Sequence, residues 1–581
     1  MRLSTPLALA LFASAASACD SGSSLNGGDG SVQVSLVQVP QDVACLKVMV
    51  TGPRPLTQLI DVTPGGTSTY TITRLPIGII SISAEAFSQV CNAVSSAVPN
   101  YVTDAPVSVR VDAVDVNMVT LTLIRNGRLG VGVDFEQGPV PYLVPTAAGI
   151  TTKALFTTGD TVNTKPDLSP YRMVGIPDGL GAFDNGDGTF TLLMNHELQS
   201  AGITRAHGAT GAFVSKWRIR KTSDLTVLSG SDLIQNVAVF NPVTATYLPP
   251  ATGNVFSRFC SADLAPISAF YDSGSGLGYN GRLFLNGEEV TGGKAWAHAL
   301  TGTSWELPRL GKQAWENLLA NPATGTKTVV VGNDDTTPGQ VYVYIGTKTN
   351  TGTPVQMAGL TNGSLYGVAV TGVASEDSTL GITSGTAFTL APLGNVETLT
   401  SAQIETASDA GGVTKFLRPE DGAWDPLHPA DYYFVTTNAF TAPSRLWRLR
   451  FNDLNNLTAG GTIDMLLDGT EGQKMFDNIA VDKKGHVYLL EDVGNNAWIG
   501  KVYRYTIATD QLTMIAQHNP DLFNPGALHF LTQDEESSGI IDASDVIGPG
   551  WFLLDVQAHY ATDAELVEGG QLLALFDPAA M

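Results

Sequence analysis

Basic residues are scarce in this sequence: 32 lysines and arginines stand against 55 aspartates and glutamates, giving a net charge of -23. Nothing in the chain forms a basic run. Because nucleic-acid binding depends on neutralising phosphates, this charge argues strongly against a nucleic-acid partner. The excess carboxylates have two interpretations, namely a solvated, soluble surface or local clusters that hold hard cations such as calcium.

Several catalytic motifs are also missing. The sequence has no G-x-S-x-G nucleophile elbow, no H-E-x-x-H zinc motif and no P-loop, which argues against the hydrolases built on them. Its eight histidines are scattered, with no pair at metal-ligand spacing. Only His196 in "NHE" and His559 in "VQAHY" stand out, each as either a site residue or a satisfied core histidine.

Long apolar runs are absent after the N-terminus. Met1 and Arg2 precede "LALALFASAASAC", which is too short for a membrane span and ends in small residues before Cys19. We predict a bacterial lipoprotein signal peptide over residues 1–18, acylation of Cys19 and a Gly/Ser-rich tether over 19–30. The protein is then exported and anchored by lipid to the cell envelope. The alternative is an ordinary secretory signal cut after Ala18.

Cysteine is rare, and each of the four residues needs an explanation. Residues 31–137 consist of short alternating β-branched segments such as "CLKVMVTG" and "IISISAEAF", which predict a β-sandwich that serves as a spacer or adhesion domain. Cys45 and Cys91 both lie in it, and in an exporting compartment they are expected to form a disulfide. Cys260 is left alone, as either a small buried hydrophobe or a metal ligand.

The sequence pattern of residues 140–581 is typical of an all-β domain. Short strands such as "VYVYIGT" and "LWRLRF" are broken by Gly, Asp and Asn at intervals of a few dozen residues, which favours a β-propeller over a closed barrel or a large sandwich. One helix is predicted in "LPRLGKQAWENLLANP" (307–322), where Leu310, Ala314 and Leu318 recur at a spacing of four.

Carboxylates repeatedly follow apolar strands in this region. Each one alone is explained by a solvated turn, but acids gathered at a channel mouth repel one another, and a multivalent cation relieves that cost. The candidates for calcium binding or for an outer shell are Glu197, Asp334, Asp335, Asp477, Glu491 and Asp492.

The ordered series "PDGLGAFDNGDGTFTLLMNHE", "RFCSADL", "GRLFLNGEE", "AWEN", "VVVGNDD", "RPEDGAWDP", "FDNIAVD", "VYLLED" and "WFLLDVQAHY" resembles the PhoX-type alkaline phosphatases and their relatives. The resemblance spans residues 150–581 and marks the chain as a divergent member. It implies a six-bladed propeller with an iron–calcium cluster (Fe³⁺ and Ca²⁺) at the channel mouth. The implied activity is hydrolysis of phosphate monoesters outside the cytoplasm.

The resemblance also implies residue roles. Cys260 resembles the thiolate that binds iron, and Glu289, Glu316 and Glu420 resemble glutamates of the metal site. Arg418 resembles the arginine that binds phosphate. A guanidinium is suited to this role because it can donate two hydrogen bonds to one phosphate. The alternative for Arg418 is a rim residue paired with Asp421 or Glu420.

Three functions follow from these observations. The first is an extracytoplasmic metal-dependent phosphatase acting on a small phosphorylated substrate. The second is a surface-anchored propeller that only binds a polymer or protein and uses calcium to stiffen its loops. The third is a related hydrolase of another ester, such as a phosphodiester or a lactone. Fold alone does not decide among them.

Overall fold

The chain divides into two compact units: residues 1–140 with 560–563, and residues 141–559 with 564–581. The structure is a computed structural model. It describes residues 7–11, 29–36, 39, 43–64, 68–94, 99–103, 106–111, 120–125, 140–165 and 170–581.

The first unit is a set of nine strands joined by antiparallel ladders in the order β4-β3-β6-β7-β9-β1-β2-β5, with β8 paired to β6. The strands are β1 (Leu7–Leu11), β2 (Asp29–Leu36), β3 (Cys45–Thr51), β4 (Leu56–Asp61), β5 (Ser68–Pro76), β6 (Gly78–Phe87), β7 (Tyr101–Thr103), β8 (Val107–Val111) and β9 (Thr120–Arg125). Alternate residues of β3 and β6 are buried in one apolar core, as the period of two predicts.

The predicted disulfide is present, since Cys45 at the start of β3 is bonded to Cys91. The segment predicted as a signal peptide includes β1, while Cys19 lies outside the described residues. Export and lipid anchoring therefore stay predictions.

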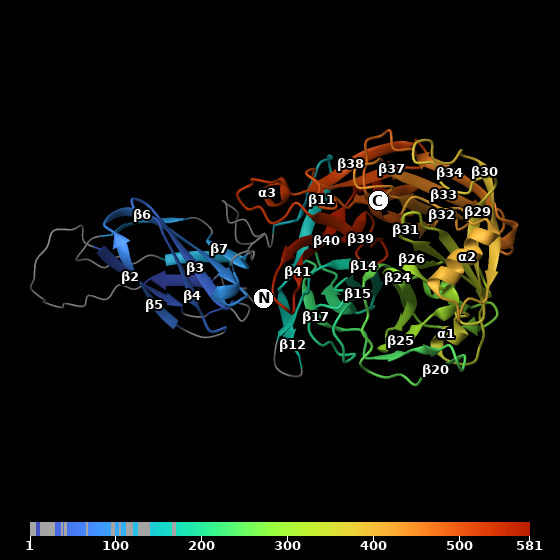
Figure 1. Cartoon of the computed structure of the whole chain (residues 1–581), viewed down its shortest axis with the longest axis horizontal. Coiled ribbons are helices and arrows are strands. Elements are labelled where there is room, and N and C mark those ends of the chain that lie inside the picture. The colour runs from blue at the N-terminus through green and yellow to red at the C-terminus, as the bar shows by residue number, and fades with distance from the viewer. Residues whose placement is uncertain are drawn as a thin grey trace, which may run out of the picture. The chain divides into compact units, whose positions relative to one another are not determined.

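The second unit is built from sheets arranged around a common centre (Figure 1). One sheet has the order β14 (Pro177–Asp184), β15 (Thr189–His196), β16 (Phe213–Arg220) and β17 (Val227–Asp232). The next has the order β11 (Thr151–Thr157), β41 (Glu568–Phe576), β40 (Trp551–Ala561) and β39 (Glu535–Asp542). Because β11 comes early in the chain and β41 comes last, their pairing closes the unit.

A third sheet has the order β10 (Leu143–Pro145), β38 (Gln511–His518), β37 (Lys501–Thr506), β36 (His486–Glu491) and β35 (Phe476–Val481). The remaining large sheet runs β18 (Asn236–Ala238), β25 (Thr303–Glu306), β24 (Leu283–Ala299), β26 (Lys312–Ala320), β27 (Lys327–Asp334), β28 (Val341–Thr347), β29 (Ser364–Val370), β30 (Thr386–Gly394), β34 (Gly461–Leu467), β33 (Arg445–Phe451), β32 (Asp431–Thr436) and β31 (Pro419–Trp424), with β21 (Phe259–Asp263) paired to β24.

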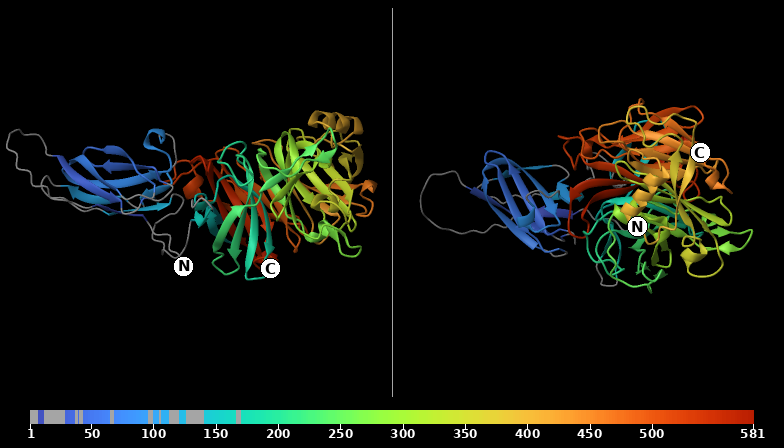
Figure 2. Two further views of the ribbon diagram at one scale, coloured as in Figure 1. Left: turned by 90° about the horizontal axis from the view of Figure 1, so that it is seen from below. Right: turned by 45° about the vertical axis from the view of Figure 1, so that its right-hand side comes forward.

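Three two-stranded ladders complete the second unit: β12 (Thr161–Thr164) with β13 (Pro170–Arg172), β19 (Phe240–Asn241) with β20 (Thr246–Tyr247), and β22 (Tyr271–Asp272) with β23 (Leu277–Gly278). The helices are α1 (Pro354–Met357), α2 (Ser401–Gly411) and α3 (Pro520–Phe523). The longest, α2, begins at a Thr400–Gln403 capping box and packs on β26, β29 and β30 (Figure 2). None of the helices in the described part of the chain has the length and apolar character to cross a bilayer.

Six strands form the inner wall of the second unit. β14, β21, β26, β31, β35 and β39 contact one another in that order, and β39 contacts β14 again, so the ring is closed. Apolar clusters fill the spaces between successive sheets, for example the one that packs Phe190 and Trp217 against Leu553 and Leu572. This arrangement is an all-β propeller and confirms the predicted fold class for this part of the chain.

The helix predicted over 307–322 is wrong. Pro308–Leu310 forms a short 3-10 turn, and Lys312–Ala320 is the inner strand β26. An inner strand is covered on both faces, so Gln313 to Leu318 are all buried and the alternation typical of a strand is lost. The spacing of four among apolar residues was therefore uninformative here.

Candidate metal centre

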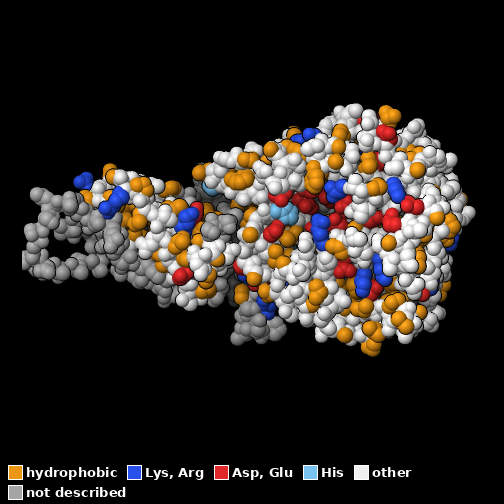
Figure 3. All heavy atoms as spheres, viewed as in Figure 1, with side chains coloured by type: hydrophobic (Ala, Val, Ile, Leu, Met, Phe, Trp, Pro, Cys, Tyr) orange, Lys and Arg blue, Asp and Glu red, His pale blue; other side chains and the backbone are white. Residues whose placement is uncertain are grey.

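Each of the six inner strands carries one acidic or thiol side chain where the ring closes at one end of the channel. These residues are Asp178 (β14), Cys260 (β21), Glu316 (β26), Glu420 (β31), Asp477 (β35) and Glu536 (β39). We call them the ring-end cluster. In Figure 3, acidic side chains gather with cationic and histidine side chains over the centre of the ring.

A break in register lies at each of these positions or begins within two residues after it. The pairing of β26 with β27 shifts between Trp315 and Asn317, and that of β31 with β32 shifts between Pro419 and Gly422. Corresponding shifts occur on the other four inner strands. A bulge re-aims one side chain out of the regular alternation, and Cys260, Glu316, Glu420 and Asp477 lie inside such breaks, whereas Asp178 and Glu536 come just before one.

Three inner strands are also preceded by a strained residue at this end. Ile176, Arg418 and Met475 adopt positive φ values of 48°, 59° and 50°, and each lies two residues before a member of the ring-end cluster. A β-branched residue such as Ile176 rarely occupies this region. Strain of this kind persists where the surrounding structure holds a functional arrangement in place.

Three groups of donor atoms lie together in and beside the cluster. Asp178, Glu197 and Cys260 form one group, Cys260, Glu289 and Glu316 the second, and Glu316, Glu420 and Asp477 the third. Within each group the donor atoms lie within 4.8 Å of one another. Since Cys260 and Glu316 are each shared by two groups, the three groups form one continuous chain of ligand atoms.

Cys260 is fixed at the centre of this chain. Its Sγ lies 3.3 Å from Oδ2 of Asp178, and its carbonyl accepts a hydrogen bond of 2.6 Å from Nδ2 of Asn195. Burial, followed by the charge of Asp178, raises the pKa of the Cys260 thiol well above its usual range. The thiol is 3% exposed, so it is a buried cysteine, but it is surrounded by acids rather than by apolar groups.

The buried acids oppose one another in the absence of a cation. Burial raises the pKa of Glu316 and of Asp477 well above the usual range, and repulsion by Glu420 raises both further. Several carboxylate oxygens are buried with no hydrogen-bond partner among the described residues: Oε1 of Glu197, Oε2 of Glu289, Oε1 of Glu316 and Oδ1 of Asp477. Orphaned oxygens on carboxylates that face one another, together with a thiol, fit a site for hard cations and iron.

Two arginines border the carboxylates. Arg258 donates to Oε1 of Glu289 at 2.7 Å and lies 3.3 Å from Oε2 of Glu197. Arg418 donates from Nε and Nη2 to the two oxygens of Asp335, both at 3.0 Å, and its Nη2 lies 2.7 Å from Oε1 of Glu420. The guanidinium of Arg418 is therefore oriented by Asp335 while it faces the cluster.

Asp421, the other partner considered for Arg418, does not pair with it. Its Oδ1 accepts from Nδ2 of Asn317 at 2.6 Å and its Oδ2 accepts from the backbone N–H of Ile479 at 3.1 Å.

His559 belongs to the site, whereas His196 does not. The Nδ1 of His559 lies 2.6 Å from Oε2 of Glu568, and its Nε2 lies 3.8 Å from Oε2 of Glu536. Burial opposes the charged imidazolium, but Glu536 and Glu568 outweigh it and hold the pKa of His559 well above its usual range. His196 is fully buried between the carbonyl of Gly175 and the hydroxyl of Ser215, as a satisfied core histidine.

The other predicted outer-shell acids divide into two sets. Asp335 orients Arg418, and the carboxylate of Asp492 interacts with Glu536 and His559, so both border the cluster. Asp334 instead accepts from the backbone N–H of Ala314, and Glu491 accepts from the backbone N–H of Lys474. These last two satisfy backbone donors and do not join the donor groups.

Sequence reasoning missed four residues of this site: Asp178, Arg258, Glu536 and Gln557. Gln557 places its Nε2 3.2 to 3.4 Å from carboxylate oxygens of Asp178, Glu197 and Glu536. A signal for two of the four does exist. An acid or cysteine followed by a small or polar residue is the second residue of five inner strands, in "DG", "CS", "ED", "DN" and "ES", and the same pattern, "EN", lies in the middle of β26.

Comparison with known proteins supports this description at the level of fold. No family model and no curated protein matches the chain. Among solved structures, PhoX of Pseudomonas fluorescens in complex with vanadate, a transition-state analogue, matches with a TM-score of 0.56 and 12% identity. The match covers 76% of this chain and 97% of PhoX. The chain shares the fold of PhoX. The resemblance to PhoX-type proteins is thus confirmed at the level of the fold.

Proposed function

We propose that the protein is an extracytoplasmic, metal-dependent phosphatase that hydrolyses phosphate monoesters at the ring-end cluster of a six-bladed propeller. The observation that carries the proposal is the chain of thiol and carboxylate ligands at one end of the channel, bordered by two arginines. The fold shared with PhoX, whose structure holds the transition-state analogue vanadate, supports the same reaction class.

Cys260, Glu289, Glu316 and Glu420 would hold iron as Fe³⁺, because a thiolate is the soft donor of the set and the carboxylates supply charge. The remaining acids, Asp178, Glu197 and Asp477, would hold Ca²⁺ through oxygen atoms. Such metals polarise the ester and make a nucleophile available near neutral pH.

The protein's own groups have distinct tasks in this proposal. Arg418, held by Asp335, binds the phosphoryl oxygens and stabilises the charge that develops on them. Its Nη1 has no partner among the described residues, so one donor is available to a substrate oxygen. Arg258 neutralises Glu197 and Glu289 on the opposite part of the cluster.

The cellular setting belongs to the same proposal. A signal peptide over residues 1–18 and a lipid on Cys19 would place the enzyme on the bacterial envelope, where the Cys45–Cys91 disulfide is stable. The substrate is then a small phosphorylated molecule outside the cytoplasm.

Turnover of a chromogenic phosphate monoester tests the proposal. The full chain, made in an exporting host and purified without chelator, is assayed at mildly alkaline pH before and after calcium chelation. We expect activity that disappears on chelation and returns with added calcium. Folded, metal-loaded protein with no turnover would exclude the phosphatase and leave another ester or a binding role.

A further inference from the structure

The channel contains a second chamber beyond the ring-end cluster. All six inner strands contribute to it, through residues that follow the cluster members along each strand. The chamber has a volume of about 310 Å³. None of the six residues of the ring-end cluster lines it, so the chamber and the cluster are two different sites. This size lies at the lower end of the range for small-molecule pockets.

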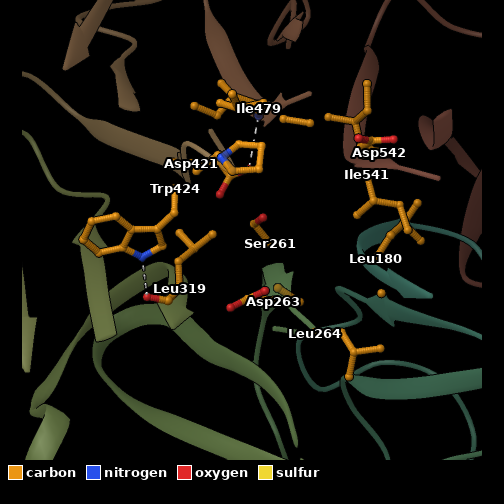
Figure 4. Close-up of a pocket in the computed structure, with 18 of the residues that line it drawn as sticks. Leu180, Ser261, Asp263, Leu264, Leu319, Asp421, Trp424, Ile479, Ile541 and Asp542 are labelled. Carbon is orange, nitrogen blue, oxygen red and sulfur yellow. Dashed lines mark hydrogen bonds between the residues drawn. The ribbon is translucent and has the colours of Figure 1, made fainter. Parts of the chain in front are cut away.

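The walls of the chamber are mostly apolar. Leu180, Leu264, Leu319, Ile541 and the indole of Trp424 surround the space shown in Figure 4. The indole is held in place because its Nε1 donates to the carbonyl of Leu319 at 3.2 Å. Such a wall favours a ligand with a hydrocarbon or aromatic part.

The charged side chains of the chamber are mostly acidic. Five aspartates and one lysine line it: Asp263, Asp421, Asp425, Asp542, Asp545 and Lys483. Lys483 is paired with the exposed Asp545, so it does not compensate the deeper acids. Asp263 and Asp421 lie on the chamber wall with Ser261 between them (Figure 4).

The two deeper acids differ in their remaining acceptor capacity. Asp263 uses only Oδ2, which accepts from the backbone N–H of Ala320 at 2.8 Å. Asp421 accepts from Asn317 and from the backbone N–H of Ile479, and Ser261 and the backbone of Gly422 also interact with its carboxylate. Two carboxylates in an apolar chamber with no facing cation are complementary to a positively charged ligand.

We propose that this chamber binds a small organic cation of the primary-amine class, with its ammonium group on Asp263 and Asp421 and its apolar body against Leu264, Leu319 and Trp424. A divalent metal fits less well, because the described residues of the chamber include no three acidic, histidine or cysteine side chains gathered at metal-ligand distance. The ammonium group can also face the indole ring of Trp424, an arrangement that stabilises organic cations. The site is independent of the proposed phosphatase activity.

Calorimetric titration of the full-length, metal-loaded protein tests the assignment. The probes are benzylamine and hexylamine, with the neutral isosteres benzyl alcohol and hexanol. We expect the amines to bind and the alcohols to bind at least about tenfold more weakly, because the charge-assisted hydrogen bond is lost.

Four variants test whether the amines bind in the chamber. Asp263→Asn keeps an acceptor for the Ala320 N–H and should weaken amine binding by about tenfold or more. Asp453→Asn, at an exposed turn outside the chamber, should leave the affinity unchanged. Leu264→Trp fills the chamber and should abolish binding even if Asp263→Asn does not fold. Glu316→Gln, in the ring-end cluster, should retain it, which excludes binding of the amine to the cluster.

Three results would overturn the assignment. Equal affinity for alcohols and amines would show a chamber that selects only apolar shape. Binding that survives both Asp263→Asn and Leu264→Trp would place the amine elsewhere. Absence of binding by both amines at millimolar concentration would indicate a channel filled only with water.

Discussion

The two ends of the same six strands differ in how their acids are satisfied. At the ring end, Glu316 and Asp477 each keep a buried oxygen without a partner in the described chain. At the far end, Asp263 and Asp421 accept backbone or amide hydrogen bonds and lie among apolar walls. The ring end therefore gathers carboxylate oxygens that have no donor in the described chain, whereas each of the two far-end acids accepts at least one hydrogen bond from the polypeptide. Experiments on the two ends should give different results.

The largest effect is expected at Glu316, which belongs to two of the three donor groups. Glu316→Gln removes the charge with little change in shape and should lower kcat/KM by about a thousandfold or more, together with the metal content. Asp545→Asn at the far end is the matched control and should change neither. Full activity and full metal content in Glu316→Gln would show that the ring end is not the catalytic centre.

A smaller loss is expected at Arg418. Removing one electrostatic donor to a transition state costs about 100- to 1,000-fold in kcat, so Arg418→Ala should fall in this range. Arg448→Ala is the control, because Arg448 pairs with Asp464 away from both ends of the channel. Steady-state kinetics on both variants checks this. A purely structural role of Arg418 would lower the thermal stability and leave kcat of the folded fraction intact.

Metal removal should lower the thermal stability of the protein, and variants at the ring end, but not at the far end, should change the size of this effect. Chelation leaves the ring-end acids to repel one another, and a ligand that binds only the folded state stabilises it by mass action. We expect Tm to fall by about 5 °C or more on chelation and to recover with calcium. In Glu316→Gln the fall should be smaller, whereas in Asp545→Asn it should match the unmodified protein. Scanning calorimetry that shows no fall would indicate a cluster that holds no structural metal.

The smallest effect concerns Asp263 at the far end. Burial, partly opposed by the backbone N–H of Ala320, raises the pKa of Asp263 to about 7. Because the folded state then holds its proton more tightly than the unfolded state, this group stabilises the fold at low pH. That stability is lost as the pH rises from about 4 to about 7.

Asp263→Asn should therefore be more stable than the unmodified protein at pH 8, by on the order of 1 kcal/mol. The difference should shrink or reverse at pH 4. Urea unfolding at the two pH values measures it, with Asp545→Asn as the exposed control. A constant difference between pH 4 and pH 8 would contradict a buried, proton-holding Asp263.

The sequence predicted the strands better than it predicted the site. β3, β6, β28 and β33 coincide with segments recognised by composition and turn residues. β26 was mistaken for a helix because burial on both faces removes the period of two.

The ligands were predictable only in part, for a physical reason. Cys260, Glu289, Glu316 and Glu420 came from ordered motifs, but Asp178 and Glu536 come together with them only when the ring closes. Contacts across more than 350 residues, such as that of Gln557 with Asp178, leave no local pattern. The two-residue signal shared by the inner strands becomes visible only once the six strands are aligned.

The most direct test of the central claim is the electronic absorption and metal content of the protein with and without Cys260. We predict bound iron and a thiolate-to-iron charge-transfer band that disappears in Cys260→Ser, together with phosphatase activity, in protein that remains folded. Calcium without iron, or a Cys260→Ser variant with unchanged spectrum and turnover, would contradict the assignment of the ring-end cluster as a catalytic metal centre.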